Sequence, residues 1–192
     1  EEAIFIQDEY NISKRLLLKT GIRLTKFNRF GSDTILVYQD NTPLIYDPLL
    51  GQYVNGEVTD SIFYGPNELI KSYMGFEPRL SIRYQLDDTR SIKASYQKIN
   101  QYLHLITNAS SPTPLDIWAP SGPFIKPLVG KQYALGYFYS SDDNKWDFSS
   151  EVYFKNLDNV VDYVDAADLE FNNHLETEIL YGKGRAYGLE LM

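Results

Sequence analysis

The feature that most restricts the fold of this chain is an alternation of very short and very long connections between β segments. Tight reversals are predicted at 11–14, 87–90 and 142–145, where asparagine, aspartate, serine and basic residues cluster. The connections at 28–76, 108–130 and 165–182 are far longer. Short turns at one end of a sheet and long loops at the other are typical of an antiparallel up-and-down meander.

The β segments carry apolar side chains on one face only. In segment 15–27 the even positions hold leucine, isoleucine and threonine, whereas the odd positions include Lys19 and Arg23. Successive side chains of a strand point to opposite faces, so this period of two gives each strand one apolar side. The pattern predicts seven long strands, near 3–10, 15–27, 80–86, 91–107, 133–139, 146–155 and 185–192.

Alternation alone is compatible with two folds. In a soluble sandwich the apolar faces of two sheets meet in a core, whereas in a transmembrane barrel the apolar face contacts lipid and the polar face lines a wet lumen. Segment 91–107 has no glycine or proline and is longer than the usual spacing of turns in a sandwich. Tyr10, Trp146 and Phe148 lie beside the short turns, as an interfacial aromatic girdle requires. These features favour an all-β fold that forms part of a large transmembrane β-barrel with long extracellular loops.

One segment changes its apolar phase along its length. In 91–107 the apolar residues shift from even positions such as Ile92 to odd positions such as Ile99 and Leu103. A bulge near Lys98 would reset the phase, and so would departure of the chain into a protruding hairpin. Both explanations remain open at this point.

Composition excludes several classes of function. The 192 residues carry a formal net charge of −8, which argues against a nucleic-acid partner, since phosphate binding needs clustered basic residues. There is no cysteine for disulfides or thiolate chemistry. No apolar run approaches the roughly 18 residues of a membrane helix, but a membrane strand needs only about 9 to 11. We also find no secretory signal at the first residues, so we expect either a mature chain or a piece of a longer one.

Catalytic and metal-binding patterns are weak. His104 and His174 lie far apart and neither has a second ligand at metal-binding spacing. The acidic run at 158–168 lacks the glycine and the spacing of a calcium loop, so a solvated loop face is the better interpretation. No serine lies in a G-x-S-x-G turn. We therefore expect no catalytic residue, no metal site, no cofactor and no enzyme activity.

Ligand contacts, if this chain makes any, are expected in the long connections. Exposed aromatic side chains offer flat apolar faces with hydrogen-bonding tips, which suit sugars or peptides. The alternative for the tryptophan is that it packs against its own proline-rich loop. The candidate ligand-binding residues are Trp118, Asp116, Tyr46, Tyr53 and Tyr64.

Several stretches of the chain resemble a known family. They are EPRLSIRYQLDDTRSIKASYQKINQYLHLITN at 77–108, SPTPLDIWAPSGPFIKPLVGKQYALGYFY at 111–139, and IFIQDEYNISKRLLLKTGIRLTKF near the start. They are similar to the barrel of TonB-dependent outer-membrane receptors, particularly the group with an N-terminal carboxypeptidase-like regulatory domain. The similarity covers most of the chain apart from the connection at 28–76.

The resemblance implies a receptor in the bacterial outer membrane that binds a small nutrient ligand and imports it. It implies contact with outer-membrane lipid, energy from the TonB complex through N-terminal parts that this chain lacks, and a surface lipoprotein as a candidate partner. Barrels of this family have about 22 strands, so we expect residues 1–192 to be a single region, a barrel fragment without the plug domain. Two alternatives stay open: a soluble extracellular β-sandwich that binds carbohydrate or peptide, and an adhesin or assembly component.

Overall fold

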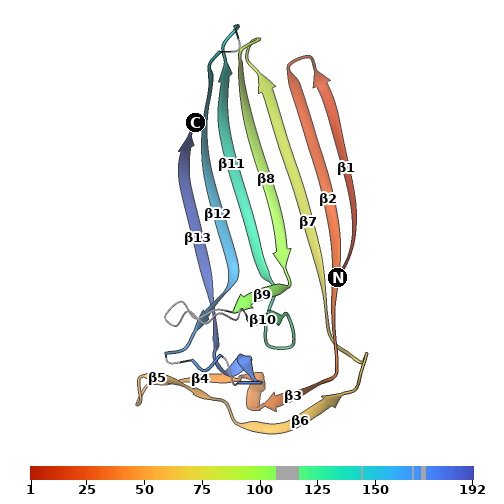
Figure 1. Cartoon of the computed structure of the whole chain (residues 1–192), viewed down its shortest axis with the longest axis vertical. Coiled ribbons are helices and arrows are strands. Elements are labelled where there is room, and N and C mark those ends of the chain that lie inside the picture. The colour runs from red at the N-terminus through yellow and green to blue at the C-terminus, as the bar shows by residue number, and fades with distance from the viewer. Residues whose placement is uncertain (107–116, 144, 166, 170–171) are drawn as a thin grey trace.

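The main body of the molecule is one antiparallel sheet of seven long strands (Figure 1). The computed structural model describes residues 1–192 except 107–116, 144, 166 and 170–171. Neighbouring strands of the sheet follow one another in chain order once the elements of the long connections are left out, so the predicted meander of seven strands is confirmed. In sheet order the strands are β1 (Glu2–Ser13), β2 (Leu16–Phe30), β7 (Leu69–Gln85), β8 (Arg90–Gln101), β11 (Leu128–Ser140), β12 (Asp147–Tyr163) and β13 (Ile179–Leu191).

Three small hairpins form in the long connections and lie at one end of the sheet (Figure 1). The sequence pattern predicted no strands in these connections. It also made three of the long strands too short on the loop side: β2 extends to Phe30, β7 begins at Leu69, and β12 extends to Tyr163. Two short 3-10 helices, η1 (Gln39–Asn41) and η2 (Leu175–Thr177), lie there too. The hairpins pair β3 (Asp33–Tyr38) with β6 (Val58–Tyr64), β4 (Leu44–Asp47) with β5 (Gln52–Asn55), and β9 (Leu103–Ile106) with β10 (Ile117–Pro120).

The opposite end of the sheet is made of the predicted tight reversals. Ser13 closes the β1–β2 turn because its Oγ accepts hydrogen bonds from the backbone N–H groups of Arg15 and Leu16. In the β7–β8 turn, Asp87 Oδ1 accepts the backbone N–H groups of Thr89 and Arg90 at 3.0 and 2.9 Å. Side chains that replace backbone partners allow the chain to reverse within a few residues.

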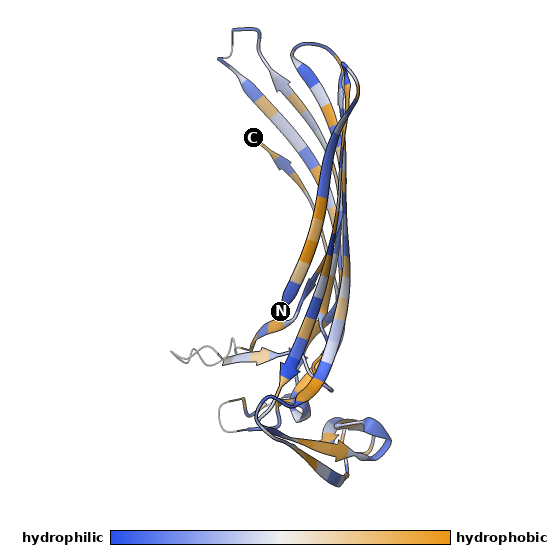
Figure 2. Cartoon of the chain, turned by 90° about the vertical axis from the view of Figure 1, so that its right-hand side faces the viewer, coloured by the Kyte–Doolittle hydropathy of each residue, from blue (hydrophilic) through white to orange (hydrophobic). Residues whose placement is uncertain are grey.

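The sheet is a single curved layer. Figure 2 shows it bowed along its length, and the other sheets of the described residues are the two-stranded hairpins at the loop end. Apolar side chains on its convex face are bare, with Ile4 79% exposed and Leu135 52% exposed. A soluble sandwich would bury such residues between two layers. The sandwich alternative is therefore wrong.

The buried apolar core lies among the long connections. This core brings together the β9–β10 hairpin, the segment that follows it, and the connection between β12 and β13. The described parts of these connections consequently pack against one another at the end of the sheet. The core residues are Ile106, Ala119, Ile125, Leu169 and Ile179.

The phase change in segment 91–107 has a clear structural cause. The pairing of β7 with β8 ends at Arg79↔Gln97, while β8 stays in continuous register with β11 as far as Gln101. The chain then leaves the sheet and enters the β9–β10 hairpin. Where β8 separates from β7, the carboxylate of Glu77 accepts the backbone N–H of Asn100 at 3.0 Å. Because β8 shows no register shift, Ile99 stays on the concave face of the sheet, whereas Leu103 and Leu105 lie on β9 after the chain has left it. For these two leucines, departure into a hairpin is the explanation that is observed.

Within the described residues, no helix is both long enough and apolar enough to cross a membrane.

Candidate functional site

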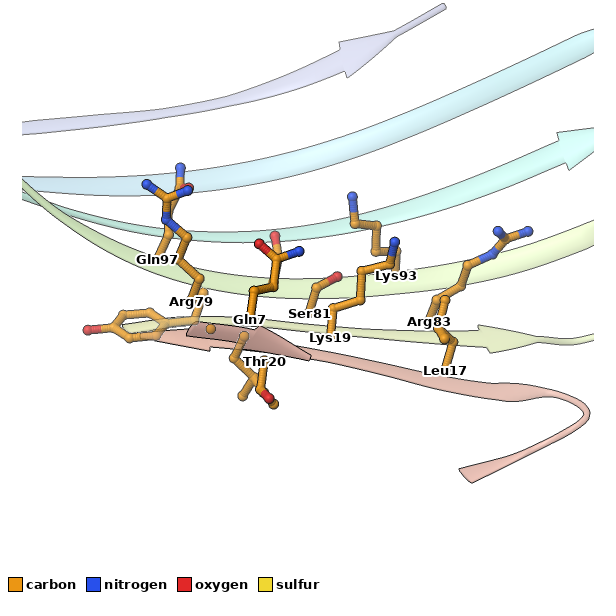
Figure 3. Close-up of a pocket in the computed structure, with 13 residues that line it drawn as sticks. Gln7, Leu17, Lys19, Thr20, Arg79, Ser81, Arg83, Lys93 and Gln97 are labelled. Atoms are coloured by element: carbon orange, nitrogen blue, oxygen red, sulfur yellow. The ribbon is translucent and has the colours of Figure 1, made fainter. Parts of the chain in front are cut away.

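A cluster of basic side chains occupies the concave face of the sheet (Figure 3). It comprises Lys19 on β2, Arg79 and Arg83 on β7, and Lys93 on β8, which line a hollow of about 460 Å³. In Figure 3 these side chains point to one side of the sheet, together with Gln7, Ser81 and Gln97. Thr20, the neighbour of Lys19, points to the other side.

Strand register explains how these cations converge. Lys19 lies opposite Ser81, which is two residues from both Arg79 and Arg83 on β7. Arg83 in turn lies opposite Lys93 on β8. Because residues at i and i+2 share a face, the basic residues of three strands gather on one surface.

Acidic residues balance this concave charge only in part. Lys19 Nζ lies 2.5 Å from Glu9 Oε2, and Arg23 Nη2 lies 3.2 Å from Glu1 Oε1. Within the described part of the chain, neither Arg79 nor Lys93 forms an ion pair. The hollow therefore presents a surface of positive charge, suited to carboxylate or phosphate groups.

The convex face has the opposite chemistry. Residues in register with outward-pointing Thr20 include Leu80 on β7 and Tyr96 on β8. Tyr96 and Tyr133 pack with their ring centroids 4.9 Å apart. A face of exposed aliphatic and aromatic side chains is stable against hydrocarbon and unfavourable against water.

The long connections are tied together by Tyr38. Its ring meets Phe124 edge to face at a centroid distance of 5.3 Å, and its hydroxyl donates to Glu176 Oε1 at 3.2 Å. Burial and the Glu176 carboxylate both raise the pKa of Tyr38 above its ordinary value, so the hydroxyl stays protonated and remains a donor. One side chain thus joins three connections that are distant in sequence.

His104 is part of the loop structure. It is only 4% exposed, and its Nε2 lies 3.1 Å from Ser121 Oγ. Burial lowers the pKa of His104, which keeps the ring neutral near pH 7. His174 lies elsewhere, with its Nδ1 atom 3.5 Å from Glu176 Oε1. Among the residues that the structure describes, no group of three or more histidine and acidic side chains could hold a metal ion.

Comparison with known proteins decides the family. The family model described as "TonB dependent receptor-like, beta-barrel" matches residues 1–192. The chain belongs to the TonB-dependent receptor family. No protein with curated annotation matches the chain.

Solved receptor structures share the fold of this TonB-dependent receptor chain. They include the alcaligin outer-membrane receptor FauA of Bordetella pertussis (16% identity, TM-score 0.54) and the ferric-catecholate import receptor Fiu of E. coli K12 (19%, 0.55). A third is the hemophore receptor HasR of Serratia marcescens in complex with its hemophore HasA and heme (15%, 0.59). Each match covers 98% of this chain but only 26%, 24% and 30% of the other chains, respectively. The chain thus spans about a quarter of the length of these receptors. As a member of this family, the chain belongs to the bacterial outer membrane.

The ligand residues expected from the sequence lie at the loop end of this receptor chain but do not form one site. Trp118, on β10, is 55% exposed and lines a hollow of about 100 Å³ beside His174. Tyr46 and Tyr53 pack together on the β4–β5 hairpin, with ring centroids 5.3 Å apart. Tyr64 ends β6 and is half-buried. The fifth candidate, Asp116, lies outside the described residues.

Residues that sequence reasoning missed surround Trp118. Arg29 and Asp33 also line its hollow, and Arg29 Nη2 lies 2.5 Å from Asp33 Oδ2. Glu176 reaches the same hollow from η2. Spacing gave no signal for the pair of Arg29 and Asp33, since an i,i+4 pair is expected on a helix and not in extended segments. Only the tertiary structure forms this pair and places it beside a tryptophan 85 or more residues away.

Proposed function

We propose that this chain forms part of the barrel wall of a receptor that binds a small nutrient ligand outside the cell and imports it. One observation carries the proposal: a single curved sheet with a bare apolar convex face and a charged concave face. That arrangement, in a chain that matches the receptor family throughout, supports lipid outside and a wet lumen inside.

The sheet needs further strands to close. β1 and β13 are the two edges of the sheet, and backbone groups left unpaired at an edge are unfavourable in lipid. A closed barrel pairs every strand, and barrels of about 22 strands surround a plugged lumen. We propose that residues 1–192 are a single barrel segment and that other parts of the receptor supply the remaining strands and the plug.

The concave cations have a role consistent with such a plug. Arg79 and Lys93 are available for acidic side chains of a domain inside the lumen. Movement of that domain would be driven by the TonB complex, which contacts parts of the receptor other than this chain. The described parts of the connections at the loop end offer a surface for a lipoprotein partner outside the cell.

The loop end supplies the ligand-binding surface in this proposal. Trp118 and the Tyr46–Tyr53 pair present exposed aromatic faces there, and we retain Asp116 and Tyr64 as further candidates. The structurally similar receptors are named for alcaligin, for ferric-catecholate import and for a hemophore with heme. The family consists of transport receptors, and we propose no catalytic role for this chain.

Uptake by cells tests this function. Cells with and without the complete receptor are supplied with labelled ferric catecholate, haem, an oligosaccharide or a peptide, in the presence and absence of TonB. We expect uptake of one class that needs both the receptor and TonB. Absence of receptor-dependent uptake, or uptake that persists without TonB, would contradict the proposal.

A matched pair of tryptophans tests the binding surface. Trp118→Ala removes an exposed ring at the loop end, whereas Trp146→Ala removes an exposed ring beside the β11–β12 turn at the opposite end. Loss of a central aromatic contact commonly costs about 2 kcal/mol or more, which is more than tenfold in affinity. We expect this loss of affinity for the imported ligand in Trp118→Ala and not in Trp146→Ala. Equal affinities for the two variants would exclude Trp118 from the site.

A further inference from the structure

On four strands the outward face carries a basic residue two positions to the loop side of an apolar or aromatic side chain. A few apolar residues, such as Val129 on β11 and Tyr181 on β13, lie beyond these cations. Alternate residues share a face, so these cations point outward and not into the lumen. They are Lys26 after Leu24 on β2, Lys98 after Tyr96 on β8, Lys131 before Tyr133 on β11, and Arg185 before Tyr187 on β13.

Three of these cations form a single row across the sheet. Lys98 is in register with Lys131, Lys131 with Asn156, and Asn156 with Arg185. The adjacent row on the same face is aromatic throughout. It consists of Tyr96, Tyr133, Phe154 and Tyr187.

The next outward row on the loop side is polar except for Val129, so the three cations of the row lie where the aromatic residues give way to polar ones; that next row is Asn100, Val129, Asp158 and Lys183. Aromatic side chains collect where hydrocarbon meets the polar headgroups, and Lys or Arg beside them can lay its aliphatic stem on apolar surface while its charge reaches the headgroups. Neighbouring strands lie about 4.8 Å apart, so the row from β8 to β13 is about 14 Å wide. That width matches a headgroup that carries more than one phosphate better than a single small anion.

The row also has more positive than negative charge around it. Lys131 Nζ lies 3.5 Å from Asp158 Oδ2. Across the residues that the structure describes, Lys98 and Arg185 form no ion pair. Two outward cations beside the aromatic row therefore lack a counter-charge among the described residues.

We propose that Lys98, Lys131 and Arg185 bind the phosphate groups of an outer-leaflet lipid against the neighbouring aromatic row. We assign the lipid to one chemical class, phosphorylated saccharolipids such as lipid A, because the loop end lies at the outer surface of the membrane in the proposed function. This inference rests on that function for its orientation. If the row served an acidic protein partner instead, removal of these cations would leave lipid A retention unchanged.

The test uses the complete receptor that contains this chain, embedded in phosphatidylcholine nanodiscs. Lipid A with both phosphates, or lipid A with its phosphates removed, is added, and retained lipid is counted by native mass spectrometry. The test variant combines Lys98→Gln, Lys131→Gln and Arg185→Gln. The control variant removes the same charge from the concave face, by Arg79→Gln, Lys93→Gln and Lys155→Gln. Lys155 is on this face because it lies opposite Gln132, which lies opposite the concave residue Gln97.

We expect the parent receptor and the concave variant to retain phosphorylated lipid A equally. Each cation near an anionic lipid surface contributes roughly fivefold, so the outward variant should retain it at least about tenfold less well. Equal retention by the outward variant, or equal retention of phosphate-free lipid A by the parent, overturns the proposal. If the triple variant does not fold, Lys98→Gln alone is scored, with a loss of about threefold to fivefold expected and no loss contradicting it.

Uptake is measured with the same receptor variants. Lipid retention that does not depend on the outward cations, with TonB-dependent uptake intact, refutes the lipid site and leaves the transport proposal standing. Absence of uptake in the parent receptor refutes the transport proposal instead.

Discussion

Ala94 and Ser95 are adjacent residues of similar size that point to opposite faces of the sheet, and they give the sharpest test of its orientation. Ala94 is exposed on the convex face, in register with Ile82 and Leu135. Ser95 lines the concave hollow and is in register with Ser81. Both are in β8 at the centre of the seven-stranded sheet.

The position of Ala94 sets the size of the expected effect. It lies midway between the outward residues Arg90 and Lys98, about 13 Å of strand from each at about 3.3 Å per residue. Because barrel strands are tilted by about 35–45°, this span of about 26 Å along the strand covers about 20 Å of height, within an apolar band about 25 Å tall. Ala94→Arg should therefore cost about 2 to 4 kcal/mol, the cost of arginine near the bilayer midplane on the lipid side. Ser95→Arg adds a charge beside other cations in water, where repulsion at about 4 Å costs about 1 kcal/mol.

The assay is folding of the complete receptor into lipid vesicles across a guanidinium series. The folded fraction is read from the heat-dependent shift of the folded band in electrophoresis. Ala94→Arg should lower the folded-to-unfolded ratio by about 30-fold or more, since 1.4 kcal/mol is tenfold, and Ser95→Arg should lower it by about fivefold or less. Equal losses for the two variants, or a larger loss for Ser95→Arg, would refute the assigned faces.

Three other side chains give separate predictions. Glu77 is 3% exposed and accepts two hydrogen bonds from Asn100, so Glu77→Ala should destabilise the receptor by about 2 kcal/mol in guanidinium unfolding. Glu9→Ala, which breaks the exposed ion pair with Lys19, should cost less than about 1 kcal/mol. Similar unfolding midpoints for the two variants would count against the role of Glu77. Hydrogen bonds from Arg90 and Thr89 lower the pKa of Asp87 below 3.8, so its stabilisation of the turn is present above that pH and is lost as pH falls toward the lower folded value. Turn amides should exchange hydrogen faster near pH 3 than at pH 5 after correction for intrinsic rates, an effect that Asp87→Asn should abolish, and its persistence in that variant would contradict the assignment. Tyr38→Phe removes the hydrogen bond to Glu176 and should destabilise the packing of the long connections by about 1 kcal/mol, measured as faster proteolysis of the connections with unchanged stability of the strands. An unchanged rate of cleavage would show that this hydrogen bond does not hold the connections together.

The sequence was sufficient for the sheet because its signals are local. Leucine and isoleucine at even positions of β2, with Lys19 and Arg23 at odd positions, define both faces before any partner strand is known. Asp87 and Ser13 mark the turns through hydrogen bonds to residues two or three positions away. Seven strands and their order follow directly from such local features.

The connections depended on contacts between distant residues and could not be predicted in this way. Tyr38 meets Phe124 and Glu176, which belong to two other connections. The hairpins around it are stabilised by that packing more than by any sequence period. The separation of β8 from β7 likewise depends on Glu77 and Asn100, which lie on different strands.

The candidate site was predictable only in outline. Exposed aromatics at the loop end were expected, yet Trp118 and the Tyr46–Tyr53 pair lie on different hairpins. The concave cations were expected on β2 from Lys19, but their convergence with Arg79 and Lys93 became visible only through the register of three strands.

The orientation of the sheet is tested most directly by spin labels at Ile82 and Arg83, adjacent residues on opposite faces of β7. Accessibility to oxygen, which concentrates in hydrocarbon, and to a water-soluble nickel chelate is measured for each label in the complete receptor in lipid bilayers. A label at Ile82 should be relaxed mainly by oxygen, and one at Arg83 mainly by the nickel chelate. The reverse order, or the same preference at both positions, would contradict a lipid-facing convex side and a water-filled concave side.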